Sequence, residues 1–402
     1  MFKSGRVRIL VALVVVVAFG GAGQAIAQLH GEVAHSAMSG STLMPTTAQF
    51  GAWTHWIVHN PEFVELNVSG FDRPFEKTVD QSQAQGALHW QYDDNNHLLF
   101  RVRQFDLGAQ ASNFLWGGTL GRPMFSPAFG LSSVSDYNAY LDGQMINLAL
   151  ARPTGGGGAW SIGLLFADAG FKNNAADPEF EDKSTAFGGQ VTWGNGDGLD
   201  LAASVSRESS TFGGGDAELE SDFLNFDINA RIARGNGWVY QLGFILGTGS
   251  VVDDDESMMG VIANVGRHLL QTDAGGVTAE FYVSYLGFKD EPVDEEEFTD
   301  SFLTVPGMRV AAWSQISRRF QVMGGANAAW SRLSEERDPV EEVGEIDRSW
   351  RGFDVNLTGG LAYTPTATFR IEGELDLGEV NNLLSLGNTT PLLARVGAKY
   401  AF

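Results

Sequence analysis

The feature that most constrains this chain is a two-residue alternation between apolar and polar side chains. From Phe353 to Tyr363, and again from Phe369 to Leu377, every second residue is apolar or glycine, and most of the residues between them carry charge, amide or hydroxyl groups. Side chains of a β-strand point alternately to the two faces of a sheet, so this period predicts strands. The sequence therefore predicts an all-β fold.

The polar face of these strands argues against a soluble sandwich or propeller. A soluble sheet buries an apolar face in its core, whereas here the face opposite the aliphatic stripe is strongly polar. An apolar outside and a polar inside is the arrangement that lipid imposes. We therefore expect a transmembrane antiparallel up-and-down β-barrel. The polar positions include Asp227, Asn229, Arg231, Glu280, Arg370, Glu372 and Glu374, and the stripe includes Leu224, Phe226, Ile228, Val283, Tyr285, Ile371 and Leu375.

Short and long links alternate between the predicted strands. The short links are rich in Gly, Asn and Asp, as in Asn195–Gly198, which is tight-turn chemistry. Short turns on one side and long loops on the other are typical of bacterial barrels. About 16 strands are expected between residues 62 and 402, or 14 if residues 28–96 form an N-terminal plug. The segments are 62–69, 84–92, 97–105, 144–152, 158–167, 185–194, 199–208, 221–234, 238–249, 257–269, 276–288, 303–315, 320–331, 353–363, 369–377 and 392–402.

The N-terminus has the three parts of a secretory signal. Lys3, Arg6 and Arg8 precede an apolar run from Ile9 to Phe19, and small residues follow up to Ala27. The run is shorter than the roughly 20 residues that cross a bilayer, so we expect a signal peptide over residues 1–27. Residues 28–61 are then a periplasmic or lumenal segment.

Composition excludes several kinds of partner and site. The sequence has no Cys, which excludes disulfides and thiolate metal sites. Its formal net charge of -23 argues against nucleic acid, because that partner requires a basic face.

The last strand resembles the C-terminal signature of Gram-negative outer-membrane β-barrels, the porin-like family. Such barrels end in an aromatic residue, preceded by apolar residues at alternate positions, and Val396, Ala398, Tyr400 and Phe402 match this pattern. The resemblance implies an outer-membrane location and recognition of this strand by the barrel assembly machinery. It also implies contact with outer-membrane lipids and lipopolysaccharide, and leaves a homo-oligomer open.

Three classes of function fit such a barrel. The first, which we favour, is a porin-like channel for passive diffusion of small hydrophilic solutes or ions, with modest cation preference. The second is a plugged 14-stranded transporter of hydrophobic compounds, which resembles the fatty-acid transporter family in strand count only. The third is an outer-membrane hydrolase or a structural barrel. Because no GxSxG or HExxH motif is present, we expect no enzyme and no cofactor.

Two features of the sequence leave their interpretation open. His55 and His59 are spaced so that a helix would place both on one face, but neighbouring Trp53 and Trp56 favour an amphipathic segment, so we expect no metal site. The connection over residues 106–143 resembles in position and length the loop that porins fold into the lumen.

Charged side chains on the inner face are expected to line the pore. Their main role is mutual neutralisation, because unpaired charges are costly in a narrow lumen. A secondary role is an electrostatic barrier to permeating ions. Acidic clusters at 253–256, 290–297 and 335–345 keep loops solvated, or bind divalent cations with lipopolysaccharide. The expected pore-lining residues are Arg101, Arg103, Asp227, Arg231, Glu280, Arg370, Glu372, Glu374, Asp376, Arg395 and Lys399.

Overall fold

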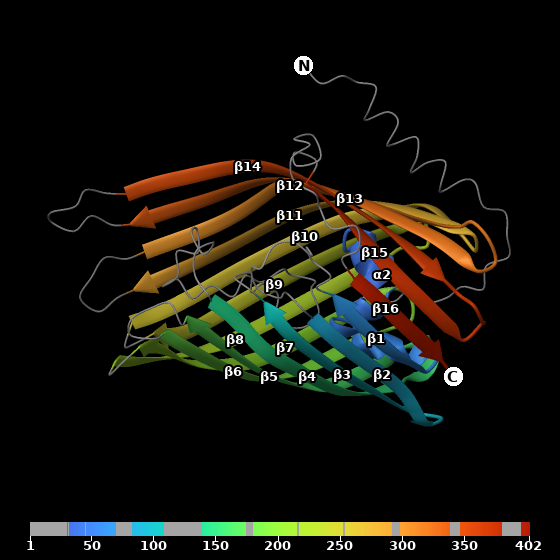
Figure 1. Cartoon of the computed structure of the whole chain (residues 1–402), viewed down its shortest axis with the longest axis horizontal. Coiled ribbons are helices and arrows are strands. Elements are labelled where there is room, and N and C mark those ends of the chain that lie inside the picture. The colour runs from blue at the N-terminus through green and yellow to red at the C-terminus, as the bar shows by residue number, and fades with distance from the viewer. Residues whose placement is uncertain are drawn as a thin grey trace, which may run out of the picture.

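Sixteen antiparallel strands close into one barrel (Figure 1). Each strand pairs with the next along the chain, and β16 returns to pair with β1, so the sheet has no free end. The prediction of 16 strands is confirmed, and the 14-strand alternative is wrong, because the segments at 62–69 and 84–92 are both strands of the wall. The computed structural model describes residues 30, 32–44, 46–69, 83–107, 139–173, 180–214, 217–251, 254–291, 298–337, 346–379 and 395–402.

The strands differ in length around the barrel. The wall is tallest from β4 to β14 and lowest at β16 and β1, where the two ends of the sheet meet. The strands are β1 (Phe63–Ser69), β2 (Gln83–Asp93), β3 (Asn96–Leu107), β4 (Ala139–Pro153), β5 (Ala159–Asn173), β6 (Phe180–Gly194), β7 (Leu199–Gly214), β8 (Ala217–Ala233), β9 (Trp238–Val251), β10 (Asp254–Thr272), β11 (Gly275–Glu291), β12 (Phe298–Gln315), β13 (Phe320–Arg337), β14 (Ile346–Tyr363), β15 (Phe369–Glu379) and β16 (Arg395–Ala401).

The two ends of the barrel have different connections. At the short-turn end, tight turns join β2 to β3, β6 to β7 and the other pairs as predicted, with Gly196, Gly198 and Gly237 in the left-handed conformation that favours glycine. At the long-loop end, strands continue past the predicted limits, so that β12 begins at Phe298 rather than near residue 303. The backbone hydrogen bonds between strands continue into polar segments that have no apolar stripe. A prediction based on alternation therefore underestimates the length of the strands.

The two faces of the wall have opposite chemistry, as expected. Leu66, Phe187 and Ile228 point outward and are 62%, 61% and 59% exposed, whereas Glu280 and Arg370 point inward and are buried. The barrel thus presents an apolar outer surface around a polar interior. None of the helices among the described residues has the length and apolar character to cross a membrane.

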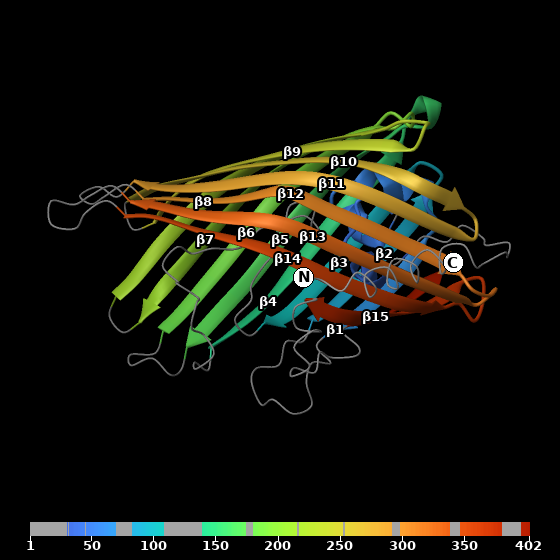
Figure 2. The ribbon, with the colours of Figure 1, turned by 90° about the horizontal axis from the view of Figure 1, so that it is seen from above.

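The space inside the short-turn half of the barrel holds the chain's own N-terminal segment (Figure 2). We call residues 30–60 the N-terminal plug, of which residues 31 and 45 are not described. It comprises α2 (Glu32–Ala37), η1 (Thr47–Gly51) and η2 (Thr54–His59). The helix α2 contacts β13–β16, while η2 contacts β3–β6 on the other side of the lumen. A further short helix, η5 (Gly155–Gly157), belongs to the turn between β4 and β5.

Candidate functional site: the N-terminal plug and its seat

The plug divides into two lobes that bind opposite walls. The first lobe, residues 30–44, lies against β10–β16, and the second lobe, residues 46–60, lies against β1 and β3–β8. Within the first lobe the apolar contacts are made by small or flexible side chains, Ala34, Ala37, Met38 and Met44, which pack on Ala311, Met323 and Ala362 of the wall.

A carboxylate of β15 holds the beginning of the first lobe. Glu372 accepts a hydrogen bond from the backbone N–H of Ala34 at 3.0 Å and pairs with Arg370 at 2.5 Å. Arg370 in turn donates to Nδ1 of His30 at 3.2 Å, so the imidazole must be unprotonated there. Burial, and then the neighbouring Arg370, lowers the pKa of His30 from 6.5 to about 3. The lobe therefore docks with His30 neutral.

A hydroxyl of β14 holds the turn after α2. Thr358 donates to the carbonyl of Ala37 at 2.9 Å and accepts from the backbone N–H of Ser39 at 3.1 Å. The Ser39 and Thr358 hydroxyl oxygens also lie 2.9 Å apart. These contacts satisfy the polar groups left free at the end of a short helix.

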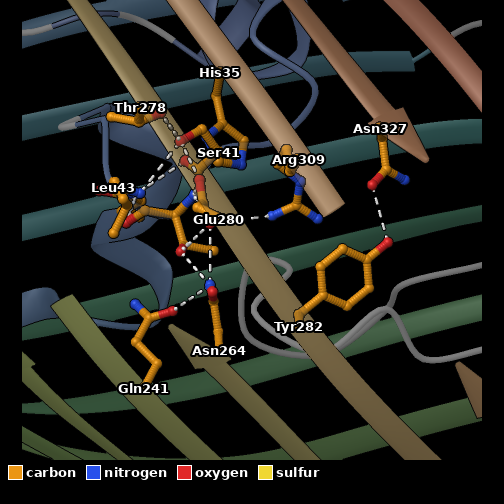
Figure 3. Close-up of polar contacts among 12 residues, drawn as sticks. His35, Ser41, Leu43, Gln241, Asn264, Thr278, Glu280, Tyr282, Arg309 and Asn327 are labelled. Carbon is orange, nitrogen blue, oxygen red and sulfur yellow. Dashed lines mark hydrogen bonds and ion pairs between the residues drawn. The ribbon is translucent and has the colours of Figure 1, made fainter. Parts of the chain in front are cut away.

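The end of the first lobe is held by Glu280 of β11 (Figure 3). Its carboxylate is fully buried and accepts from the Ser41 hydroxyl, from the Thr42 hydroxyl at 2.7 Å and from the Thr42 N–H at 3.2 Å. Asn264 of β10 donates to both Thr42 and Glu280, at 2.8 and 3.0 Å. Arg309 of β12 lies 3.6 Å away. A buried charge is stable only with such partners, so the plug and the wall satisfy it jointly.

Aromatic side chains anchor the second lobe. Phe50 and Ile57 are buried against Phe63 of β1 and Leu99 of β3, and the rings of Phe50 and Phe63 lie 6.0 Å apart. Trp53 is buried as well, packed on Ala52 and Ala202. Large buried rings bring more apolar area than the Ala and Met side chains of the first lobe, so the second lobe is held more by apolar contact.

A second buried carboxylate, Asp200 of β7, binds the second lobe. It accepts from Nε2 of His55 at 2.9 Å, from the Trp56 indole at 3.1 Å and from Arg231 at 3.0 Å. The guanidinium of Arg231 also lies over the Trp56 ring, 4.8 Å from its centre. On its other side, His55 lies 2.8 Å from the hydroxyl of Thr192.

Thr192, His55 and Asp200 form a hydroxyl–imidazole–carboxylate row, which in outline is the arrangement of a hydrolase. Each of the three is buried. The Thr192 hydroxyl also lies 2.5 Å from the Ser161 hydroxyl and accepts a hydrogen bond from the backbone N–H of His55 at 3.1 Å. A nucleophile must be reachable by its substrate. In this conformation the row acts as a clamp for the plug.

Glycines of the wall make room for the plug. A Cβ added to Gly325 would lie 2.5 Å from the Met38 carbonyl carbon, and one added to Gly360 would lie 2.6 Å from the Ala37 Cβ. Gly266 faces Leu43 at 2.6 Å and Gly194 faces His55 at 2.5 Å in the same way. Four strands, β6, β10, β13 and β14, are thus shaped to admit plug atoms that any larger residue would displace.

The polar seat follows one row of paired residues around the barrel. Asp200 pairs in register with Arg231, Arg231 with Gln241, Gln241 with Asn264, and Asn264 with Tyr282. Adjacent strands therefore place these inward side chains side by side. Nε2 of Gln241 and Oδ1 of Asn264 are buried and have no hydrogen-bond partner among the described residues.

Several expected pore-lining residues therefore contact the plug or the residues that hold it. Arg231, Glu280, Arg370 and Glu372 belong to the seat described above. The other expected residues whose side chains are described lie elsewhere on the inner face, most of them in polar interactions of their own. Asp227 accepts from Ser204 at 3.0 Å, and Glu374 pairs with Arg395 at 3.4 Å. Lys399 is buried opposite Arg370, and Arg101 and Arg103 of β3 are half-buried. Asp376 lies on β15, but its side chain is outside the described residues.

The expected assembly residues lie on β16, except Phe402, which directly follows the strand. Tyr400 and Phe402 are 45% and 54% exposed on the outer face, and their rings stack with centres 6.2 Å apart. Val396 and Ala398 precede them on the same strand face. The strand is in the wall as the alternation predicted.

Some predictions fall outside the described residues. These are the signal peptide and most of the long connection, of which residues 108–138 are not described, as well as parts of the three acidic clusters. His55, one of the two histidines weighed as a metal ligand, contacts Thr192 and Asp200 of the wall. In the described part of the chain, no group of three or more His, Asp or Glu side chains is arranged to hold a metal ion.

The residues that sequence reasoning missed are the plug's partners: Asp200, Asn264, Thr358 and the four glycines. One signal was available, namely that Gly266, Gly325 and Gly360 fall within predicted strands, where glycine marks a close approach of another backbone.

No protein-family model and no curated protein sequence matches this chain. Among solved structures, it is similar to CdiB from Acinetobacter baumannii, with 9% identity over 85% of this chain and 60% of that one, and a TM-score of 0.45. It is also similar to a bacterial polysaccharide outer membrane secretin, with 9% identity over 85% of this chain and 98% of that one, and a TM-score of 0.41. CdiB from Escherichia coli is also similar, with 12% identity over 85% of this chain and 63% of that one, and a TM-score of 0.41. The chain thus spans less than two thirds of either CdiB.

Proposed function

We propose that this chain is an outer-membrane channel protein for passive diffusion of small hydrophilic solutes, and that its N-terminal plug controls passage. The apolar outer face and the polar interior support a position in lipid. In this proposal the short-turn end is periplasmic, the long-loop end is external, and β16 is read by the barrel assembly machinery. Lipopolysaccharide and membrane lipid contact the outer face, and the net negative charge gives a modest cation preference.

One observation carries the proposal: the plug contacts the inner face of the wall almost all the way around. Its contacts reach fourteen strands, namely β1, β3–β8 and β10–β16. A segment seated in this way narrows the short-turn half of the lumen. Passage of a solute then requires at least one lobe to leave its seat.

The first lobe is the better candidate for movement. Its contacts are mainly hydrogen bonds and aliphatic or Met side chains without a ring, whereas the second lobe is anchored by Phe50, Trp53 and Ile57. Hydrogen bonds exchange readily with water, since each contributes only about 0.5–1.5 kcal/mol net, or about 1.5–3 kcal/mol to a charged group. Burial of a large apolar side chain has no such substitute in water.

The alternatives are a transporter of hydrophobic compounds and a structural barrel. The plug is compatible with a plugged transporter, but the seat of the first lobe includes carboxylate, amide and hydroxyl groups, which suit polar solutes. Our proposal includes no catalytic step, because the hydroxyl–imidazole–carboxylate row serves as a clamp.

A disulfide lock tests the control of passage by the plug. The chain has no native Cys, and the hydroxyl oxygens of Ser39 and Thr358 lie 2.9 Å apart, so Ser39→Cys with Thr358→Cys should bridge the first lobe to β14. In planar lipid bilayers we expect the oxidised variant to be silent and to conduct after addition of a reducing agent.

Each single Cys variant is the control and should conduct under both conditions. Equal conductance of the oxidised and reduced double variant would remove the proposed gating, and silence of the wild type and of all variants, reduced or oxidised, would favour a structural barrel.

A further inference from the structure

The two carboxylates in the seat of the first lobe act as hydrogen-bond acceptors for the plug. Glu280 accepts from Ser41 and Thr42, and Glu372 accepts from the N–H of Ala34. The donors in these contacts come from the plug and the acceptors come from the wall. A ligand that replaced the lobe would have to bring several donors, as a hydroxyl-rich molecule does.

The charges of this seat are already balanced within the wall. Glu372 is paired with Arg370 at 2.5 Å, and Arg309 lies 3.6 Å from Glu280. A ligand carrying a net charge would disturb this balance. The seat therefore favours an uncharged molecule over an anion or a cation.

The seat has capacity that the plug does not use. Asn264 is 8% exposed, and within the described part of the chain neither its Oδ1 nor the neighbouring Nε2 of Gln241 has a hydrogen-bond partner. Trp313 of β12 is partly buried beside the first lobe, with its ring 5.3 Å from that of His30. Aromatic rings combined with a few placed polar groups are the usual lining of a small-molecule site.

We propose that the seat of the first lobe is the binding site for an uncharged, hydroxyl-rich solute of the sugar class, and that Ser41 and Thr42 occupy it as internal substitutes for solute hydroxyls. Solute and plug then compete for Glu280 and Asn264, so binding of the solute releases the lobe. This inference rests on the proposed function, because it names the solute class that the gated lumen admits.

Competition predicts opposite effects from changes to the plug and to the wall. We would titrate the full-length protein in detergent with D-glucose by calorimetry. Ser41→Ala with Thr42→Val removes two plug hydroxyls and should raise the apparent affinity by at least about tenfold, which corresponds to about 1.4 kcal/mol. In that background, Glu280→Gln should abolish the gain in affinity. If the Glu280→Gln variant does not fold, Asn264→Ala tests the same part of the site and should also abolish the gain.

Thr46→Val is the matched control, because the Thr46 hydroxyl contacts His35 within the plug rather than the wall. It should leave the affinity unchanged. Fully O-methylated glucose keeps the ring but lacks hydroxyl donors, and it should not bind.

Absence of glucose binding in the Ser41/Thr42 variant would overturn the inference, and so would equal binding of the methylated sugar or an equal gain from Thr46→Val. Because calorimetry does not require conduction, binding without channel activity would reject the proposed function alone, and gated conduction without binding would reject the inference alone.

Discussion

Gly325 offers the most direct way to unseat the plug without removing a polar contact. A Cβ at this position would lie 2.5 Å from the Met38 carbonyl carbon and the Ser39 hydroxyl, and 2.6 Å from the Ser39 backbone nitrogen. Two of these three atoms belong to backbone, which cannot rotate away as a side chain can. Gly325→Ala should therefore push the first lobe away from β13.

The size of the effect follows from what that displacement breaks. Gly325 pairs in register with Thr358, whose hydroxyl bonds both Ala37 and Ser39. Overpacking of a filled site costs about 1–3 kcal/mol. At about 1.4 kcal/mol per factor of ten, the ratio of released to seated lobe should rise between about 5-fold and 150-fold.

The assay is the open probability of single channels in planar bilayers, with Gly324→Ala as the control. Gly324 is the adjacent residue of β13, and a Cβ there would meet only a Thr358 carbonyl oxygen at an ordinary 3.7 Å. We expect frequent opening for Gly325→Ala and wild-type behaviour for Gly324→Ala. If a correctly inserted Gly325→Ala barrel behaves as the wild type does, the plug does not control conduction.

Two further predictions concern pH and membrane insertion. Because the pKa of His30 is about 3 in the seated lobe and 6.5 when exposed, seating is strongest above pH 6.5 and weakens as the pH falls toward 3, by about 2 kcal/mol at about pH 5. Channel opening should therefore increase on acidification, and His30→Gln should remove that step between about pH 7 and pH 5; an unchanged pH profile would contradict the role of His30. Ile228→Arg on the outer face should destabilise the inserted barrel by about 2–4 kcal/mol if the residue lies at mid-bilayer, measured by urea unfolding in lipid vesicles, whereas Asn229→Arg on the inner face should be much milder. Equal losses at both positions would contradict the assigned facing.

The wall could be predicted from the sequence because its physics is local. Each strand carries its own alternation, so that Leu224, Phe226 and Ile228 identify an outer face without reference to any other strand. The ends of the strands at the long-loop side were missed because a ladder outside the apolar band needs no alternation, as in β13 from Arg332 to Arg337.

The seat could not be predicted in the same way, because each of its contacts joins distant parts of the chain. Ala34 and Glu372 are 338 residues apart, and His55 and Asp200 are 145 residues apart. The inner positions of Glu280 and Arg370 were predicted correctly, since facing is a local property. What occupies the lumen beside them is a tertiary property, and no periodicity encodes it.

The great sequence separation between the plug and its seat also fixes an order of events during biogenesis. The plug is synthesised before any strand, yet its partners Thr358 and Glu372 belong to β14 and β15, near the end of the chain. Long-range contacts of this kind form slowly, because the intervening chain must first be ordered. The binding surface of the second lobe is therefore synthesised once the chain reaches β8, whereas that of the first lobe is incomplete until β15. A chain interrupted before β15 would carry a plug whose first lobe lacks its Glu372 partner.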